Sequence, residues 1–314
     1  MYHYEDIKTL VDKETVFIGD LSNIEFDKAK NLNDADEYSI VWVKNSGQDA
    51  YDKISQTKAR VIICKNNIDL DKKILDRKCC ILTINPKYLY TKIVNHLFVP
   101  KWETGIHQSA IIDKEAKFGK NVHIGAFCYI GKCSVGANTV ILNNVTIEDE
   151  VSIGENVYIK NGARIGQTGF GFVKNEKGEW EKFPQIGDVI IEDNVEIGAN
   201  TCIDRGALST TTIGYGTKID NLVEIAHNVQ IGKNCIITGN VSIAGSCIIG
   251  DEVWIGPSVT INNGLKIGSK SFISLGSVII KNLPPNSDVI GNPAEPKESY
   301  VKKRNALSKI CKGE

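Results

Sequence analysis

Residues 213–250 read IGYGTKIDNLVEIAHNVQIGKNCIITGNVSIAGSCIIG, with an isoleucine at every sixth position. The register continues without interruption to residue 279, so that twelve isoleucines share it: Ile213, Ile219, Ile225, Ile231, Ile237, Ile243, Ile249, Ile255, Ile261, Ile267, Ile273 and Ile279. A period of six is neither the 3.6 residues of a helical turn nor the simple alternation of an isolated strand. It is typical of a parallel β-helix, in which each hexad forms one flat side and then turns a corner. The recurring isoleucine is therefore predicted to point inward.

The same period extends upstream of this stretch. The predicted inward residues there are Ile106, Ile112, Phe118, Ile124 and Ile130, then, after a one-residue slip at Val135, Ile141, Ile147, Ile153, Ile159 and Ile165, and finally Ile191, Ile197 and Ile203. Three hexads complete a coil of 18 residues, so residues 18 apart should lie above one another in neighbouring strands, about 4.8 Å apart. Two insertions, at about 167–185 and in the RGALSTT stretch after Asp204, interrupt the coils. Both are predicted to be loops, which often carry binding function.

Small residues accompany the inward isoleucines. The position two residues before the next isoleucine is usually valine or cysteine, which predicts a narrow, dry interior. Glycine or a small polar residue commonly follows the isoleucine, and we expect it where corners need unusual backbone angles. The nine cysteines include no C-x-x-C pair, so they are interpreted as reduced thiols that pack as small apolar residues, and no metal site is predicted.

Charge and hydropathy exclude several classes of function. The 37 basic and 38 acidic residues leave a formal net charge of −1, which gives no electrostatic case for binding nucleic acid or an anionic membrane surface. No stretch approaches the ~18 uninterrupted apolar residues of a membrane-spanning helix. The N-terminal stretch MYHYEDIKTLVDKE is too charged to serve as the apolar region of a signal peptide. A cytoplasmic location is expected.

The chain is predicted to have three parts. Residues 1–100 contain no hexads; YSIVWV, ARVIIC and CCILTI are predicted strands, and YLYTKIVNHLF after Asn85-Pro86 is a predicted helix. This segment should form a small α/β domain. Residues 101–296 should form the β-helix, and residues 297–314 a charged helical tail that is too short to fold alone.

Histidine is the side chain best suited to proton transfer near neutral pH, and of five in the chain only His227 lies in the later coils. It follows an inward isoleucine by two positions, at a predicted corner, so its side chain should face outward. Gly245, 18 residues further on, should lie directly above it with a bare backbone N–H, and Asp220-Asn221 in the preceding hexad could orient the ring. Periodicity alone leaves open a solvated corner histidine without chemistry. A base, a carboxylate and a backbone donor on one face favour acyl transfer.

A three-faced prism can bury one face by packing around a threefold axis. A homotrimer is therefore expected, with ligand sites in the clefts between neighbouring subunits.

Longer motifs carry a more specific resemblance. The stretch GFGF…GEW…PQIG…VIIEDNVEIGANTCIDRGAL…IDN…IAHNVQIG closely resembles the bacterial UDP-3-O-acylglucosamine N-acyltransferases, lipid A pathway enzymes with a left-handed β-helix. The resemblance extends over nearly the whole chain and includes Asn85-Pro86 followed by Tyr90. It implies a mainly β fold: a left-handed parallel β-helix of hexapeptide repeats, with a small N-terminal α/β domain and a short C-terminal helix.

The resemblance also implies catalytic roles. His227, in the run IAHN, matches the family's general base. Gly245 matches the residue whose backbone N–H stabilises the oxyanion, and Asp220 matches the carboxylate near the base.

Substrate-binding residues follow from the same resemblance. Trp42 occupies the place of an aromatic residue that stacks on uracil, and Asn45 that of its hydrogen-bonding partner, so residues 1–100 should bind the nucleotide. Asn221 and Asn228, which neighbour Asp220 and the base, are expected to contact the substrate.

The sequence also departs from the family pattern. Gly264 stands where the family carries a second histidine, and Ser46-Gly47-Gln48 follows Asn45 where the family has Pro-Lys-Tyr. The run Gly291-Asn292-Pro293-Ala294 resembles the coenzyme-A-dependent sugar acetyltransferases, whose matching run lies beside the cofactor. The residues expected at the acyl donor are therefore Gly264, Gly291, Asn292 and Pro293.

These departures favour a paralogue that moves a short acyl group, such as acetyl, from acyl-CoA to the amino group of a UDP- or dTDP-linked amino sugar. No tightly bound cofactor is expected, and Cys247, at an inward small position, is rejected as a nucleophile. The alternative is a lipid A N-acyltransferase that uses acyl carrier protein. An alternative of a different functional class is a solenoid that binds a partner and has no catalytic activity. A metal hydratase on the same scaffold would need three converging histidines.

Overall fold

The computed structural model describes residues 1–21 and 24–312, and the last two residues of the predicted tail lie outside this part. The chain divides into two compact units, Met1–Lys101 and Trp102–Glu314.

The N-terminal unit is a five-stranded sheet in the order β1-β5-β4-β3-β2, in which only β1 runs antiparallel to its neighbour. Its elements are α1 (Tyr4–Ile7), β1 (Val16–Gly19), β2 (Lys28–Ala29), η2 (Leu32–Asp34), β3 (Ser39–Trp42), α2 (Gly47–Gln56), β4 (Val61–Lys65), α3 (Lys72–Leu75), β5 (Cys79–Thr83) and α4 (Pro86–Leu97). The three predicted strands and the predicted helix are confirmed as β3, β4, β5 and α4.

Local chemistry explains where α4 begins. The Asn85 side-chain oxygen accepts a hydrogen bond from the Tyr88 N–H at 3.2 Å, and Pro86 occupies the first turn, where a missing N–H costs nothing. The strands alternate in facing, so one apolar cluster includes Ile54 of α2 and the other Ile93 of α4. The two helices therefore cover opposite faces of the sheet.

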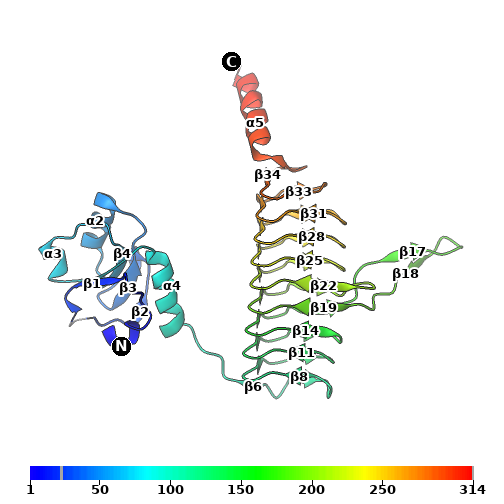
Figure 1. Ribbon diagram of the computed structural model, residues 1–314, viewed down its shortest axis with the longest axis horizontal. Coiled ribbons are helices and arrows are strands. Elements are labelled where there is room, and N and C mark those ends of the chain that lie inside the picture. Colours follow the sequence, from blue (N-terminus) through cyan, green and yellow to red (C-terminus); the bar gives the residue numbers. More distant parts are fainter. Residues whose placement is uncertain (22–23, 313–314) are drawn as a thin grey trace. The chain divides into compact units, whose positions relative to one another are not determined.

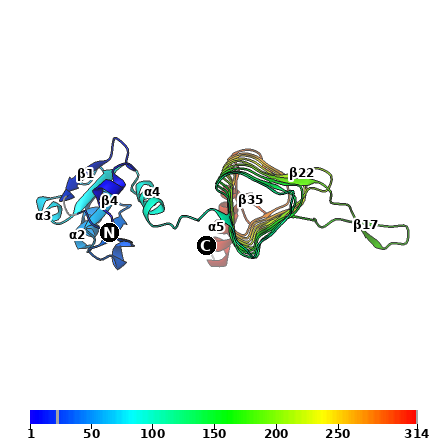
Figure 2. The same ribbon diagram turned by 90° about the horizontal axis from the view of Figure 1, so that it is seen from below.

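The second unit is a prism with three parallel sheets as its faces (Figure 1). Viewed along the prism, the coils superpose into a triangle (Figure 2). Face A contains β7 (Ile111–Ile112), β10 (Tyr129–Ile130), β13 (Thr146–Ile147), β16 (Arg164–Gln167), β21 (Cys202–Asp204), β24 (Glu224–Ile225), β27 (Ser242–Ile243), β30 (Thr260–Ile261) and β33 (Val278–Ile279). Face B contains β8 (Lys117–Phe118), β11 (Ser134–Val135), β14 (Val151–Ile153), β19 (Asp188–Ile191), β22 (Thr210–Ile213), β25 (Gln230–Ile231), β28 (Ile248–Ile249) and β31 (Lys266–Ile267).

Face C carries the remaining strands of the prism. These are β6 (Gly105–Ile106), β9 (His123–Ile124), β12 (Val140–Ile141), β15 (Tyr158–Ile159), β20 (Glu196–Ile197), β23 (Lys218–Ile219), β26 (Ile236–Ile237), β29 (Trp254–Ile255), β32 (Phe272–Ile273), β34 (Asp288–Ile290) and β35 (Glu295–Pro296). Only β35 pairs antiparallel, with β34. The chain visits the faces in the order C, A, B, and each corner lies between two of them.

The predicted stacking rule is confirmed. Ile225 pairs with Ile243, and Ile219 with Ile237, each 18 residues further along the chain. All twelve isoleucines from Ile213 to Ile279 are at most 3% exposed. The first coil is different, because it forms the open end of the prism: Ile106 is 50% exposed.

Most glycines that follow the inward isoleucines do not supply unusual backbone angles, and Gly166, with φ 85°, is an exception, so that expectation is largely wrong. Left-handed backbone occurs two residues later in the hexad, mostly at asparagine: examples are Asn200, with φ 54°, and Asn240, with φ 60°. The glycines supply room instead. A Cβ at Gly198 would lie 2.2 Å from the Asp220 carbonyl carbon, in the coil above. The coils pack too closely there for any side chain.

Asparagine and aspartate side chains tie successive coils together. The residue two positions after an inward isoleucine donates its N–H to the side-chain oxygen of the corresponding residue in the next coil. Ala199 donates to Asn221 Oδ1 at 2.7 Å, and Lys233 donates to Asp251 Oδ1 at 2.8 Å. We call this series the corner ladder; it satisfies amides that would otherwise lack a partner.

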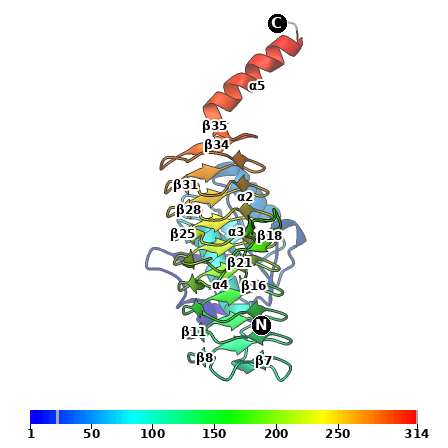
Figure 3. The same ribbon diagram turned by 90° about the vertical axis from the view of Figure 1, so that its right-hand side faces the viewer.

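Two elements leave the prism. The first insertion forms a hairpin of β17 (Phe172–Lys174) and β18 (Trp180–Lys182), which projects from the side of the triangle (Figure 2). The predicted tail helix is α5 (Lys297–Lys312), which continues beyond the last coil (Figure 3). Among the described residues, no helix is both long and apolar enough to cross a membrane.

Candidate active site

His227 lies at the corner between faces A and B, directly after β24, and is half-buried. The structure places its ring against Gly245, one coil above. A Cβ at Gly245 would lie 2.6 Å from His227 Cε1 and 2.8 Å from Nε2. Only glycine therefore lets the imidazole occupy this position.

A second glycine packs against the other side of the same histidine. Gly169, in the first insertion, is buried, and a Cβ there would lie 2.9 Å from His227 Cβ and 3.0 Å from Cδ2. Gly169 and Gly245 thus hold the imidazole between them. Sequence periodicity could not find Gly169, because the insertion that contains it has no repeat.

Asn228 determines which nitrogen of the imidazole is free. Its Oδ1 accepts a hydrogen bond from the Ala207 N–H at 2.7 Å, while its Nδ2 donates to Ser209 Oγ at 2.6 Å. These two bonds fix the orientation of the amide. His227 Nδ1 lies 3.1 Å from the same Oδ1, which only accepts, so Nδ1 must carry the proton. His227 Nε2 is then left with an available lone pair.

The corner ladder is interrupted at this site. Asparagine or aspartate would accept the His227 N–H from position 245, but glycine has no side chain to do so. In the part of the chain that the structure describes, neither the His227 N–H nor the Gly245 N–H donates a hydrogen bond. Two unpaired backbone donors beside a base are suited to stabilising a developing oxyanion.

The carboxylate beside His227 within one chain is Asp204, which sequence reasoning did not select. Burial raises the pKa of the Asp204 carboxyl, and the neighbouring His227 opposes this by lowering it. Burial also raises the pKa of Glu224, and Asp204 raises it further. Asp204 lies at the end of β21, whose Ile203 pairs with Ile225.

Asp220 is not brought to His227 within one chain. It is exposed at the corner between faces C and A, directly after β23, whereas His227 lies at the next corner. The expectation that both lie on one face of the same chain is therefore corrected. Asp220 and His227 are seven residues apart, and each side of the triangle takes six residues, so the two side chains lie at different corners.

The two predicted asparagines have structural partners. Asn221 belongs to the corner ladder and accepts the Ala199 N–H. Asn228 holds the second insertion through Ala207 and Ser209 and also orients His227. Asn221 thus lies one corner away from the imidazole, and Asn228 directly beside it.

Trp42 and Asn45 lie in the N-terminal unit, at the carboxyl end of β3. Trp42 is half-buried and packs against Tyr90 of α4, with ring centroids 6.5 Å apart; Asn45 is exposed in the loop before α2. The carboxyl edge of parallel strands is the usual ligand edge of such sheets.

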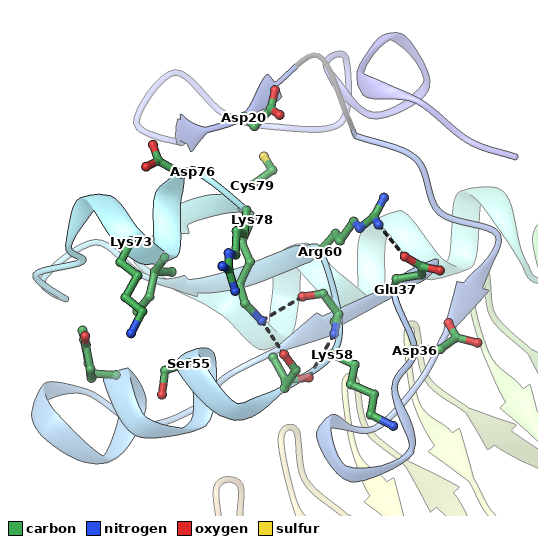
Figure 4. Close-up of a pocket in the computed structure, with 15 residues that line it drawn as sticks. Asp20, Asp36, Glu37, Ser55, Lys58, Arg60, Lys73, Asp76, Lys78 and Cys79 are labelled. Carbon is green, nitrogen blue, oxygen red and sulfur yellow. Dashed lines mark hydrogen bonds and ion pairs between the residues drawn. The ribbon is translucent and has the colours of Figure 1, made fainter.

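The opposite edge of this sheet carries a cavity of about 970 Å³ that sequence reasoning did not predict. Figure 4 shows its lining residues, in which Arg60 pairs with Glu37 and Lys78 Nζ donates to the Ala59 carbonyl at 3.2 Å. Cationic and acidic side chains share the lining, so the cavity does not present a field of one sign.

The residues expected at the acyl donor lie in the last coils. Gly264 is a corner residue with φ 71° and open space around it. Gly291, Asn292 and Pro293 form the turn that closes the prism, where the Gly291 carbonyl accepts the Val278 N–H at 3.0 Å. Asn292 and Pro293 are exposed beyond this turn.

Cys247 points into the prism interior and is fully buried. Burial raises the pKa of its thiol, which disfavours the thiolate a nucleophile needs. In the described ranges, no group of three or more His, Cys, Asp or Glu side chains could hold a metal ion.

Comparisons with known proteins agree with this architecture. The family model described as bacterial transferase hexapeptide (six repeats) matches residues 132–167, and that described as hexapeptide repeat of succinyl-transferase matches residues 188–221. The solved UDP-N-acetylglucosamine O-acyltransferase of Moraxella catarrhalis is 30% identical, with a TM-score of 0.54 over 63% of this chain and 77% of that one. The chain belongs to the hexapeptide-repeat acyltransferases. The UDP-N-acetylglucosamine acyltransferase of Francisella novicida is similar as well, at 27% identity and a TM-score of 0.56 over 64% of this chain and 73% of that one.

Curated relatives of this hexapeptide-repeat acyltransferase carry the name UDP-3-O-acylglucosamine N-acyltransferase. The protein from Coxiella burnetii is 38% identical over 207 residues, which cover 59% of this chain and 58% of the relative. That from Pseudomonas putida is 40% identical over 170 residues, 48% of each. The chain thus spans less than two thirds of these relatives, and the matched part is smaller than the near-complete resemblance expected from the motifs.

Proposed function

We propose that this acyltransferase moves an acyl group from a thioester to the amino group of a UDP-linked 3-O-acylglucosamine. The observation that carries the proposal is the fixed tautomer of His227, whose free Nε2 lies beside the bare Gly245 backbone. The names of the curated relatives favour this acceptor. They support the lipid A alternative better than a short-chain, CoA-dependent paralogue.

In the proposed reaction, the amine nitrogen attacks the thioester carbonyl carbon while His227 Nε2 takes a proton from it. The Gly245 N–H donates to the oxyanion of the tetrahedral intermediate. The carbon–sulfur bond then breaks, and the imidazolium returns the proton to the leaving thiolate. A positioned base of this kind typically contributes ~10²–10⁴-fold to the rate. No covalent enzyme intermediate is required, in keeping with the buried Cys247.

The variants His227→Ala and His227→Asn test the base. We expect kcat to fall by at least about 10²-fold in both, with an unchanged melting temperature. A near-native kcat in either variant would rule out His227 as the base.

We further propose a homotrimer whose site is shared between subunits. Asp220 and His227 lie at the two corners that flank face A. If face A points toward a threefold axis, the Asp220 corner of one subunit meets the His227 corner of the next. Asp220 would then orient the base across the boundary, and Asn221 beside it would reach the substrate.

We assign nucleotide binding to the N-terminal unit. The half-buried Trp42 offers a ring for stacking, and the exposed Asn45 offers hydrogen-bonding groups at the same strand end. The free cysteines suit a reducing compartment, which supports a cytoplasmic location.

Acyl carrier protein is the donor we favour. The exposed helix α5 carries Lys302, Lys303 and Arg304 in succession, which suits an acidic protein surface. Acyl-CoA is the second candidate, supported by the run Gly291-Asn292-Pro293 at the end of the prism. Rates with a 3-hydroxyacyl carrier protein and with acetyl-CoA, measured side by side, decide between them. A preference for acetyl-CoA would overturn our choice, and thermal stabilisation by neither donor nor by any UDP-sugar would favour a binding protein instead.

A further inference from the structure

Both insertions leave the prism at the corner between faces A and B, in the two coils directly below His227. The first follows β16, which ends at Gln167, and the second follows β21, which ends at Asp204. Each insertion also contacts the residues around the base. Gly169 of the first packs against the imidazole, and the second orients the Asn228 amide that faces Nδ1. The geometry of the base therefore depends on how the two insertions are fastened to the prism.

The first insertion removes a regular hydrogen bond from this corner. At a regular corner, the residue with left-handed backbone donates its N–H to a carbonyl in the coil below. Between faces A and B, Glu150 donates to the Lys132 carbonyl at 3.0 Å, and Ser246 donates to the His227 carbonyl at 2.9 Å. The chain above Asp149 leaves as the first insertion, and no backbone N–H of the described residues reaches the Asp149 carbonyl. This carbonyl needs a donor from a side chain.

Arg205, the first residue of the second insertion, supplies that donor. Its Nη2 donates to the Asp149 carbonyl at 2.7 Å, and its Nε donates to the Gly166 carbonyl at 2.8 Å. Its backbone N–H donates to the Gln167 carbonyl at 2.9 Å. One half-buried residue thus joins the start of the second insertion to the two residues from which the first departs.

The strand is irregular at the point that Arg205 holds. The pairing of β16 with β21 shifts by one residue between Ile165 and Gln167, and Gly166 between them has φ 85°. A bulge of this kind places an extra residue in one strand and redirects it. Because Arg205 Nε binds the carbonyl of Gly166, the guanidinium fixes the direction in which the chain leaves toward Gly169, three residues later.

The geometry of these bonds suits arginine. The two acceptors lie in different coils, and the planar guanidinium offers Nε and Nη2 in fixed, different directions, whereas lysine has a single nitrogen. We propose that Arg205 is a positioning residue for the acyl transfer. By fastening the starts of both insertions, it holds Gly169 and Asn228 around His227 and keeps Nε2 free to take the proton. The inference rests on the proposed role of His227 as the base.

The variants Arg205→Ala and Arg205→Lys test this role by kinetics. We expect kcat to fall about 10- to 100-fold in both, because a displacement of about 1 Å at a reacting centre has an effect of this size. The KM values for acceptor and donor should stay close to native, since Arg205 acts through other residues. Ethylguanidinium ion, added below the concentration that unfolds the protein, should restore part of the lost kcat in Arg205→Ala.

Nitrogen NMR of the protein labelled at histidine measures the base without turnover. In the native protein, His227 should carry its hydrogen on Nδ1 alone, and the His227→Asn spectrum identifies its signals. In Arg205→Ala, we expect both tautomers of His227, because Asn228 is no longer held in one orientation. Ethylguanidinium ion should return the ring to the single tautomer.

Arg164→Ala is the matched control. The Arg164 guanidinium also donates to backbone carbonyls, those of Gly162 and Ala163 at 2.8 and 3.1 Å, but at the corner between faces C and A. This variant should lose stability in urea titrations while kcat and the His227 tautomer stay native. A native kcat in folded Arg205→Ala, or a lower kcat with an unchanged tautomer, would overturn the inference and leave the proposed function intact. A native kcat in His227→Ala would instead overturn the proposed function.

Discussion

Replacing Gly245 by alanine tests the packing of the base with a single methyl group. The backbone at this position tolerates alanine, because Ala199 occupies the same position of its hexad at another corner and the φ of Gly245 is not positive. The whole effect should therefore come from the imidazole, which would lie 2.6 Å from the new methyl at Cε1 and 3.1 Å at Nδ1.

Carbon atoms in ordinary contact are about 3.5–4.0 Å apart, so the ring must move by about 1 Å. Gly169 blocks retreat on the other side, and Asn228 resists rotation. A displacement of this size at a reacting centre can cost about 10²-fold in rate. We expect kcat of Gly245→Ala to fall by about that factor, with an overpacking cost of about 1–3 kcal/mol in stability.

Steady-state kinetics and urea unfolding at one pH measure both quantities. The reverse change at the same hexad position of a different corner, Ala199→Gly between faces C and A, should leave kcat unchanged and serves as the control. A native kcat for Gly245→Ala with a folded chain would refute the reasoning, because the base would then not depend on its position above Gly245.

Three further results are expected. Asn228→Ala should lower kcat by about 10-fold or more, because the ring loses the acceptor that fixes its tautomer, whereas Asn228→Asp should retain most activity; equal activity in both variants would contradict this role in kinetic assays. Trimers assembled from equal amounts of Asp220→Asn and His227→Ala subunits should show about a quarter of native activity. One subunit boundary in four then joins a native Asp220 of one subunit to a native His227 of the next. The absence of activity in these mixed trimers would exclude a shared site. In urea titrations, Asp204→Asn should have a higher free energy of unfolding than the native protein at pH 8 but not at pH 3. Burial raises the pKa of Asp204 in the folded state, so the cost of its ionisation appears as the pH rises through that value. The same difference in free energy of unfolding at both pH values would contradict this prediction.

The architecture of this protein could be predicted from its sequence because one physical requirement repeats without change. Each coil must bury the same inward positions, so an isoleucine every sixth residue fixes the period, the stacking at 18 residues and the place of Gly245 above His227. The same regularity located Cys247 in the interior. Local rules were sufficient here because every contact in a coil is with its immediate neighbours.

The tertiary structure alone decided what surrounds the base. Gly169 reaches His227 from an insertion with no period, so no spacing in the chain connects the two residues. Asp204 lies beside the imidazole and Asp220 does not, because distance in a coil depends on which corner a residue occupies rather than on separation along the chain. The buried positions repeat along the chain and can be predicted from a short stretch of sequence. The polar partners of one side chain depend instead on where the irregular insertions lie in the folded structure.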